Sequence, residues 1–67
     1  MSLYTIGVSY TAGEEERFEL VDPEWRLPDL MARPFASRCN EQYNVPPLYR
    51  HYQVFNINDE RVKDLLQ

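Results

Sequence analysis

The sequence has very few of the residues that form disulfides, phosphate-binding loops or metal sites in a small domain. One cysteine, Cys39, is present among 67 residues, so no intramolecular disulfide can form. Two glycines, Gly7 and Gly13, are too few for a glycine-rich phosphate-binding loop. Cysteine, histidine and carboxylate side chains do not cluster at metal-binding spacing, so we expect neither a metal nor a cofactor. Stability must therefore come from packing, and self-association into a homodimer would add to it.

Long apolar runs are also missing. No segment reaches the roughly 15 consecutive apolar residues that a signal peptide or a membrane span would need. The sequence therefore predicts no membrane partner. A single cysteine is typical of a reducing compartment, and we expect a cytoplasmic location.

Positive charge is scarce, and lysine is nearly absent, with Lys63 the only one. The formal net charge is −4, and the deficit lies wholly in the first half of the chain. An acidic cluster there could dock on a basic protein surface or imitate nucleic acid. Alternatively it is a solvated hairpin end that protects an edge strand from aggregation. The cluster comprises Glu14, Glu15, Glu16, Glu19, Asp22 and Glu24.

The alternation of residues 2–10 predicts a half-buried strand, and residues 17–21 predict a second one. We expect residues 11–13 to form a three-residue hairpin loop with Gly13 at positive φ. That register places Ile6 opposite Phe18. A five-residue loop would instead place Val8 opposite Phe18, and both registers match the apolar faces.

Two helices are expected, and residues 29–43 are the main candidate. Side chains at a spacing of four residues predict one apolar stripe on the first helix. Pro34 places its regular part at residues 34–43, with a kinked turn over residues 28–33. Asn58 is the expected N-cap of a C-terminal helix that runs to Gln67. Trp25 lies between these parts and is expected to fold back on the edge of the core. The stripe consists of Met31, Phe35, Cys39 and Tyr43, with Ala32 and Ala36 beside them.

Residues 48–57 form the most β-prone run and predict a third strand with large side chains on both faces. The chain as a whole, residues 1–67, is expected to be one α+β domain with the order β-β-α-β-α. We predict a three-stranded, mostly antiparallel sheet of order 2-1-3 with a helix packed on one face and a short C-terminal helix.

The third strand also supplies the main candidate binding residues, Tyr49, Arg50 and Tyr52. Arginine beside aromatic residues is typical of protein–protein hot spots and also of surfaces that bind single-stranded nucleic acid. The net negative charge and the single lysine argue against direct nucleic-acid binding, which depends on many cationic contacts. Another protein is therefore the expected partner.

A thiol enzyme that uses Cys39 and His51 is the weakest hypothesis, because the cysteine lies on the apolar stripe. We predict a non-enzymatic protein that interacts with, regulates or inhibits another protein. The alternative is a nucleic-acid-directed protein, either an acidic mimic or a weak binder through the Arg/Tyr strand. Size and charge resemble those of phage or plasmid accessory proteins, which is an association only. The predicted partner-binding residues are Tyr49, Arg50, Tyr52, Glu14, Glu15 and Glu16.

Overall fold

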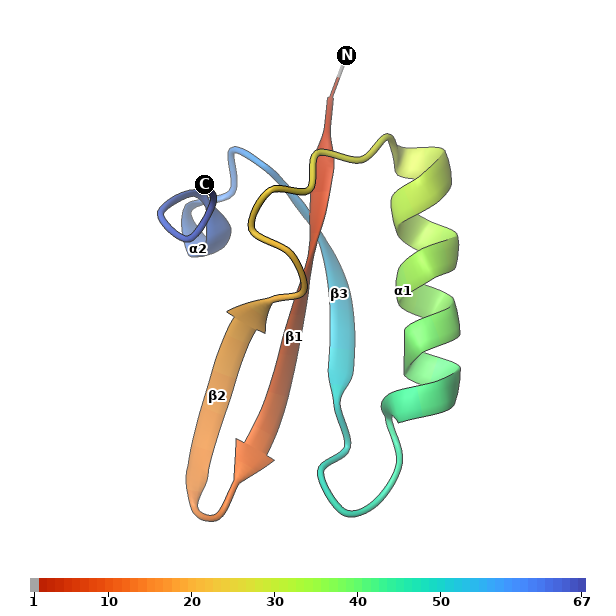
Figure 1. Ribbon diagram of the computed structural model, residues 1–67, viewed down its shortest axis with the longest axis vertical. Helices are drawn as coiled ribbons and strands as arrows, with labels where there is room; N and C mark the ends of the chain where they lie inside the picture. Colours follow the sequence, from red (N-terminus) through yellow and green to blue (C-terminus); the bar gives the residue numbers. More distant parts are fainter. Residues whose placement is uncertain (1) are drawn as a thin grey trace.

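The computed structural model describes residues 2–67 and shows a three-stranded antiparallel sheet with one long helix on one face (Figure 1). The strands are β1 (Tyr4–Ala12), β2 (Glu15–Leu20) and β3 (His51–Asn56). The helices are α1 (Asp29–Tyr43) and the short α2 (Glu60–Lys63). The sheet order is β2-β1-β3, as the sequence predicts, so β1 is central and both other strands are edges. The α+β class and the element order are confirmed.

The hairpin register differs from both predicted registers. Ser9 lies opposite Phe18 and Gly7 lies opposite Leu20, so the loop has only two residues, Gly13 and Glu14. Gly13 adopts φ 67° as the first loop residue, which is typical of a tight hairpin turn with glycine in that position. The shift places Phe18 on the face of the sheet away from α1, because neighbouring residues along a strand point to opposite faces.

Gly7 makes room for the aromatic side chains on that second face. The rings of Phe18 and Phe55 meet edge to face, with 5.5 Å between their centroids. A Cβ atom on Gly7 would lie 2.6 Å from Phe18 Cζ and 2.7 Å from Phe55 Cε2. The bare backbone of Gly7 therefore allows the two rings to lie across the central strand.

The main core lies between α1 and the other face of the sheet. Ile6 and Ala32 are fully buried and Ala36 nearly so, with Tyr52, Val54 and other apolar side chains packed around them. Small residues on α1 let the helix lie close to the sheet, and burying such apolar area supplies about 25 cal/mol per Å². The predicted stripe is confirmed at Ala32, Ala36 and Cys39, which are buried, and is wrong at its ends, because Met31 is 58% exposed and Tyr43 is 47% exposed.

Helix α1 has the bounds of the predicted helix candidate, residues 29–43, but it is regular from Asp29 and continues through Pro34, whereas the sequence predicts a kinked turn over residues 28–33. Pro28 is its N-cap, and the carbonyl of Pro28 accepts hydrogen bonds from Met31 and Ala32. Pro34 cannot donate to the carbonyl of Leu30, but Leu30 is 87% exposed, so water can satisfy that carbonyl. The missing hydrogen bond is therefore tolerated inside the helix.

The C-terminal segment closes on the segment between β2 and α1. Helix α2 is capped by Asp59 rather than by the predicted Asn58, and it spans only Glu60–Lys63. The backbone N–H of Gln67 donates to Pro23, and Arg26 donates to the Gln67 carbonyl at 3.0 Å. Trp25 packs at the core edge as predicted, with its ring 4.9 Å from that of Phe35. Within residues 2–67 no helix has the length and apolarity needed to cross a bilayer.

Candidate protein-binding surface

Tyr49 belongs to the loop between α1 and β3, not to the strand as predicted. The loop is held by hydrogen bonds from the Tyr49 N–H to Val45 and from the Arg50 N–H to Tyr43. Tyr49 adopts φ 53°, and its side chain is 57% exposed. Left-handed backbone costs a residue with a Cβ atom about 1–2 kcal/mol, so the loop holds this tyrosine outward at an energetic cost.

We call the end of the sheet around Tyr49 the tyrosine–arginine surface and define it by Tyr10, Glu16, Tyr49 and Arg50. Tyr10, Glu16 and Tyr49 line one shallow depression of about 270 Å³. The guanidinium carbon of Arg50 lies 5.9 Å from the centre of the Tyr10 ring, within the range of a cation–π contact. The Tyr10 side chain points to the face of the sheet that carries α1, whereas Glu16 points to the second face, so the surface extends around this end of the sheet.

The other predicted binding residues lie in different places. Tyr52 is half-buried under α1, and its ring centre lies 6.2 Å from that of Tyr43. Burial, with the nearby Cys39 as the next cause, raises the pKa of the Tyr52 hydroxyl above 10.0. Glu14 and Glu15 are exposed at the hairpin tip, where Glu15 forms an ion pair of 3.0 Å with Arg17. Only Glu16 of the acidic residues shares a depression with Tyr49.

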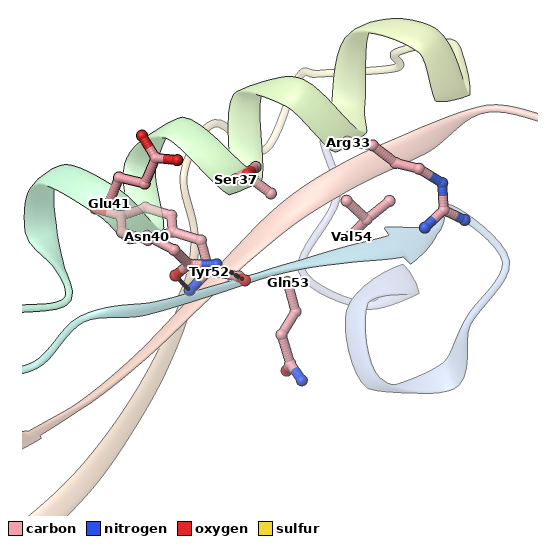
Figure 2. A pocket seen from close by; sticks show the side chains of 8 residues that line it. Arg33, Ser37, Asn40, Glu41, Tyr52, Gln53 and Val54 are labelled. Atoms are coloured by element: carbon pink, nitrogen blue, oxygen red, sulfur yellow. Dashed lines mark hydrogen bonds between the residues drawn. The ribbon is translucent and has the colours of Figure 1, made fainter.

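Asn40 closes the outer edge of β3, a role that the sequence prediction missed. Its side-chain amide donates to the Tyr52 carbonyl at 2.9 Å and accepts from the Tyr52 N–H at 2.7 Å (Figure 2). A neighbouring strand would make the same pair of hydrogen bonds, so Asn40 takes the place of one. A polar residue four positions after the buried Ala36 was the available signal. The groove of about 660 Å³ beside it is lined by Arg33, Ala36, Ser37, Asn40, Glu41, Tyr52, Gln53 and Val54.

Cys39 and His51 are not brought together. Cys39 is buried on the side of α1 that faces the sheet, whereas the side chain of His51 extends from the opposite face of β3. Burial raises the pKa of the Cys39 thiol above its usual 9.0, although the nearby Arg38 acts in the other direction. The arrangement favours the unreactive thiol over the thiolate. Within the described residues, no three Cys, His, Asp or Glu side chains are placed to hold a metal ion.

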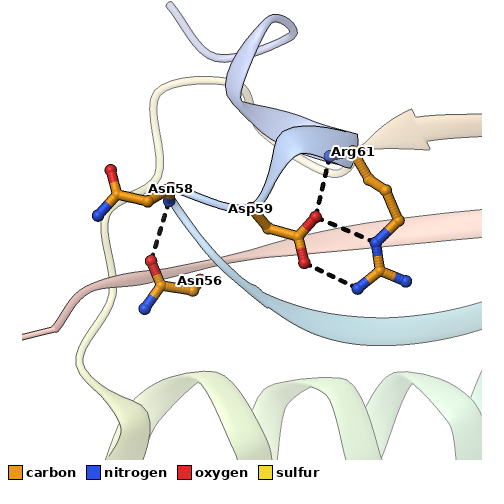
Figure 3. A network of polar contacts seen from close by, with 4 residues as sticks. All are labelled: Asn56, Asn58, Asp59 and Arg61. Atoms are coloured by element: carbon orange, nitrogen blue, oxygen red, sulfur yellow. Dashed lines mark hydrogen bonds and ion pairs between the residues drawn. The ribbon is translucent and has the colours of Figure 1, made fainter.

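The start of α2 carries a compact ion pair beside the second face of the sheet. The Asp59 carboxylate accepts from the backbone and the side chain of Arg61, with the shortest bond 2.7 Å (Figure 3). The guanidinium carbon of Arg61 lies 4.7 Å from the centre of the Phe55 ring. Asp59 therefore caps α2 and also holds Arg61 over the aromatic pair of that face.

The hydrogen bonds from the Arg61 side chain and then from its backbone lower the pKa of Asp59 from 3.8 to about 2. A lowered pKa in the folded state means that Asp59 adds stability above about pH 3.8, and that this stability disappears as the pH falls towards 2. An NMR titration of the side-chain carboxyl carbon should show the midpoint near 2. In Arg61→Ala the midpoint should rise towards 3.8; an unchanged midpoint would show that the guanidinium does not hold the carboxylate.

Comparisons of the chain with protein-family models, with curated proteins and with solved structures found no match.

Proposed function

We propose that this protein acts by binding another protein through the tyrosine–arginine surface. The observation that carries the proposal is Tyr49, which is held in a left-handed conformation with most of its ring in solvent. Residues that are held in an unfavourable backbone conformation, without a role in packing their own domain, are typical of binding and switch sites. Tyrosine and arginine are also the residues most enriched in the energetic centres of protein interfaces.

The chemistry of the surface indicates the kind of partner. Glu16 lines the same depression as Tyr49, and a lysine or arginine of the partner could pair with its carboxylate and stack on the Tyr49 ring. The hairpin tip adds the exposed carboxylates of Glu14 and Glu15 nearby in the chain, which favours approach of a basic protein surface. We therefore expect the bound patch of the partner to be basic.

The charge distribution supports a protein partner over nucleic acid. Four of the seven basic side chains already form ion pairs with carboxylates within the domain. A direct nucleic-acid binder relies on free cations and loses affinity steeply as salt rises. Absence of binding to single-stranded DNA or RNA at low salt would remove direct binding and leave only the acidic mimic as an alternative. The paired residues are Arg17, Arg33, Arg61 and Lys63.

Tyr49→Gly tests the proposal, because glycine relieves the strain while it deletes the exposed ring. Urea unfolding should show stability unchanged or raised by up to about 1 kcal/mol, since glycine tolerates positive φ but has more freedom when unfolded. Affinity capture from the native host, with identification by mass spectrometry, should lose the specific partner. Leu30→Ala removes a side chain that is 87% exposed on α1 and serves as the control that keeps the partner. A partner retained by Tyr49→Gly at full affinity would contradict the proposal.

A further inference from the structure

The outer edge of β2 is the open edge of this sheet. The N–H of Val21 donates to the Ile6 carbonyl at 2.9 Å, which fixes the odd-numbered residues of β2 as those that bond to β1. The backbone groups of Glu16, Phe18 and Leu20 therefore point away from the sheet. Among residues 2–67 no other backbone or side chain forms a hydrogen bond with them. Figure 1 shows β2 at the border of the molecule with no strand or helix along most of its outer side.

The outer edge of β3 has fewer free backbone groups than the outer edge of β2. On β3 the outward backbone groups belong to even-numbered residues, and Asn40 occupies both groups of Tyr52. The carbonyl of Asn56 is also occupied, because it accepts a hydrogen bond from the N–H of Asp59 at 2.9 Å. Between Tyr52 and Asn56, only the backbone N–H and carbonyl of Val54 are left for an added strand. An added strand would therefore find too few free partners on β3, and strand addition is directed to β2.

The side chains of β2 are complementary to a second copy of themselves. In an antiparallel pair centred on Phe18, Arg17 of each copy lies opposite Glu19 of the other, and Glu16 lies opposite Leu20. Arg17 and Glu19 then form a pair without direct backbone hydrogen bonds, the kind in which side chains approach most closely. The two-fold axis produces two such Arg17–Glu19 pairs, and both bring opposite charges together on the same face of the sheet.

Neighbouring registers are worse for electrostatic reasons. A centre on Arg17 would oppose two arginines and also set Glu15 against Glu19. A centre on Glu19 would oppose two glutamates, and a centre on Glu16 would do the same. Like charges directly opposite each other destabilise an antiparallel pair. Within β2, a centre on Leu20 opposes no two charged residues, so only the centre on Phe18 gains opposite-charge pairs without like-charge pairs, and the charges of β2 favour it.

Phe18 adds an apolar contact at that centre. Its side chain is 39% exposed although it already packs on the ring of Phe55, so part of the ring remains for another surface. At the centre of the pair, the two Phe18 rings lie on the same face of the combined sheet. They extend the aromatic contact of each domain across the interface, where aromatic pairs stabilise antiparallel strands.

We propose that two copies of this chain associate through β2, antiparallel and with the two-fold axis at Phe18, to join their sheets into one. The pairing forms about six backbone hydrogen bonds between the outward groups of Glu16, Phe18 and Leu20. The interface is isologous, because each copy contributes the same strand. Partner binding and self-association share Glu16, so self-association is tested with substitutions of Arg17 and Glu19, which lie outside the tyrosine–arginine surface.

The test is sedimentation velocity over a wide range of protein concentration. The unchanged chain should show a monomer–dimer equilibrium. Arg17→Glu should weaken the dimer at least about tenfold, because both attractive pairs become repulsive. Arg38→Glu on α1 makes the same change in net charge away from β2 and should leave the dimer unchanged. A chain that remains monomeric at the highest concentrations, or an Arg17→Glu variant that dimerises like Arg38→Glu, overturns the proposal.

A mixing experiment makes the register itself measurable. Glu19→Arg should also weaken self-association, since it sets Arg17 against an arginine. An equimolar mixture of Arg17→Glu and Glu19→Arg should form a heterodimer, because every pair in it again has opposite charges. Failure of the mixture to associate more tightly than either variant alone would overturn the proposed register. Circular dichroism of each variant should match that of the unchanged chain. Glu16→Pro removes an outward N–H, and also the Glu16 carboxylate, and provides a second edge-blocked variant for self-association alone.

Discussion

Replacing Phe55 with alanine should leave the protein largely unfolded at room temperature. Phe55 is 4% exposed and lies on the face of the sheet away from α1, where it contacts Phe18 and lies under the guanidinium of Arg61. Truncation of a buried phenylalanine costs about 3–5 kcal/mol. The whole core of a domain this small supplies only about 3–5 kcal/mol of net stability.

Urea unfolding followed by far-ultraviolet circular dichroism measures the effect. Phe18→Ala is the matched control, because it removes the other ring of the same pair from a position that is 39% exposed. Its cost should be about 1–2 kcal/mol, in proportion to the smaller area that it buries. Both variants should be measured at low concentration, so that dimer formation does not contribute. A Phe55→Ala variant as stable as Phe18→Ala would show that the second face contributes little to folding.

Gly7→Val should lower the stability nearly as much as Phe55→Ala, because it overpacks the second face of the sheet instead of leaving a cavity there. A Cβ atom at this position would lie 2.6–2.7 Å from the two phenylalanine rings, and valine adds two further methyl groups beyond it. Phe18 can swing towards solvent, but the buried ring of Phe55 has little room to move. We expect a loss of about 3 kcal/mol, at the upper end of the range for overpacked cores.

A double-mutant cycle identifies the cause of that loss. Phe18→Ala should cost less in the Gly7→Val background than alone, because it also removes one of the two clashes. The non-additive part should be about 1 kcal/mol, as for residues in direct contact. Strictly additive effects would contradict the steric explanation and would attribute the loss to the backbone of β1.

The sequence predicts the topology of this fold well because its apolar pattern is simple. The alternation from Tyr4 to Tyr10 has no competing period, and residues 29–43 have one apolar side. The short segment between β1 and β2 forces them to be neighbours. The strand order then follows from placing β3 against β1, where its apolar positions at Tyr52 and Val54 meet Ile6.

The register of the hairpin could not be predicted, because the local signals in the sequence agree on an arrangement that the tertiary contacts override. Matching apolar faces would place Phe18 beside Ile6, and a glycine at the end of a three-residue loop fits that arrangement. The structure uses Gly13 at the start of a two-residue loop, and Phe18 moves to the other face. Only Phe55 and the small Gly7 make that face suitable for an aromatic ring, and both positions depend on tertiary contacts.

Three residues of the tyrosine–arginine surface, Glu16, Tyr49 and Arg50, are among the binding residues that the sequence predicts, whereas Tyr10 is not. Tyr49 and Arg50 were recognised by residue type, whereas the turn that places them outside β3 depends on hydrogen bonds across the loop. Asn40 was missed because its role requires the edge of a strand twelve residues later in the chain. Side chains that replace backbone partners give no periodic signal in a sequence.

The amide of Asn40 also determines how large an assembly of this chain can become. A sheet with two free edges can add copies at both sides and grow without limit into a fibre. Here the outer edge of β3 is occupied from within at Tyr52 by the Asn40 side chain and at Asn56 by the Asp59 backbone, so a molecule that has used β2 offers too few free groups for another strand. Pairing through β2 would therefore terminate at two chains, and the Asn40 carboxamide contributes the larger part of that limit.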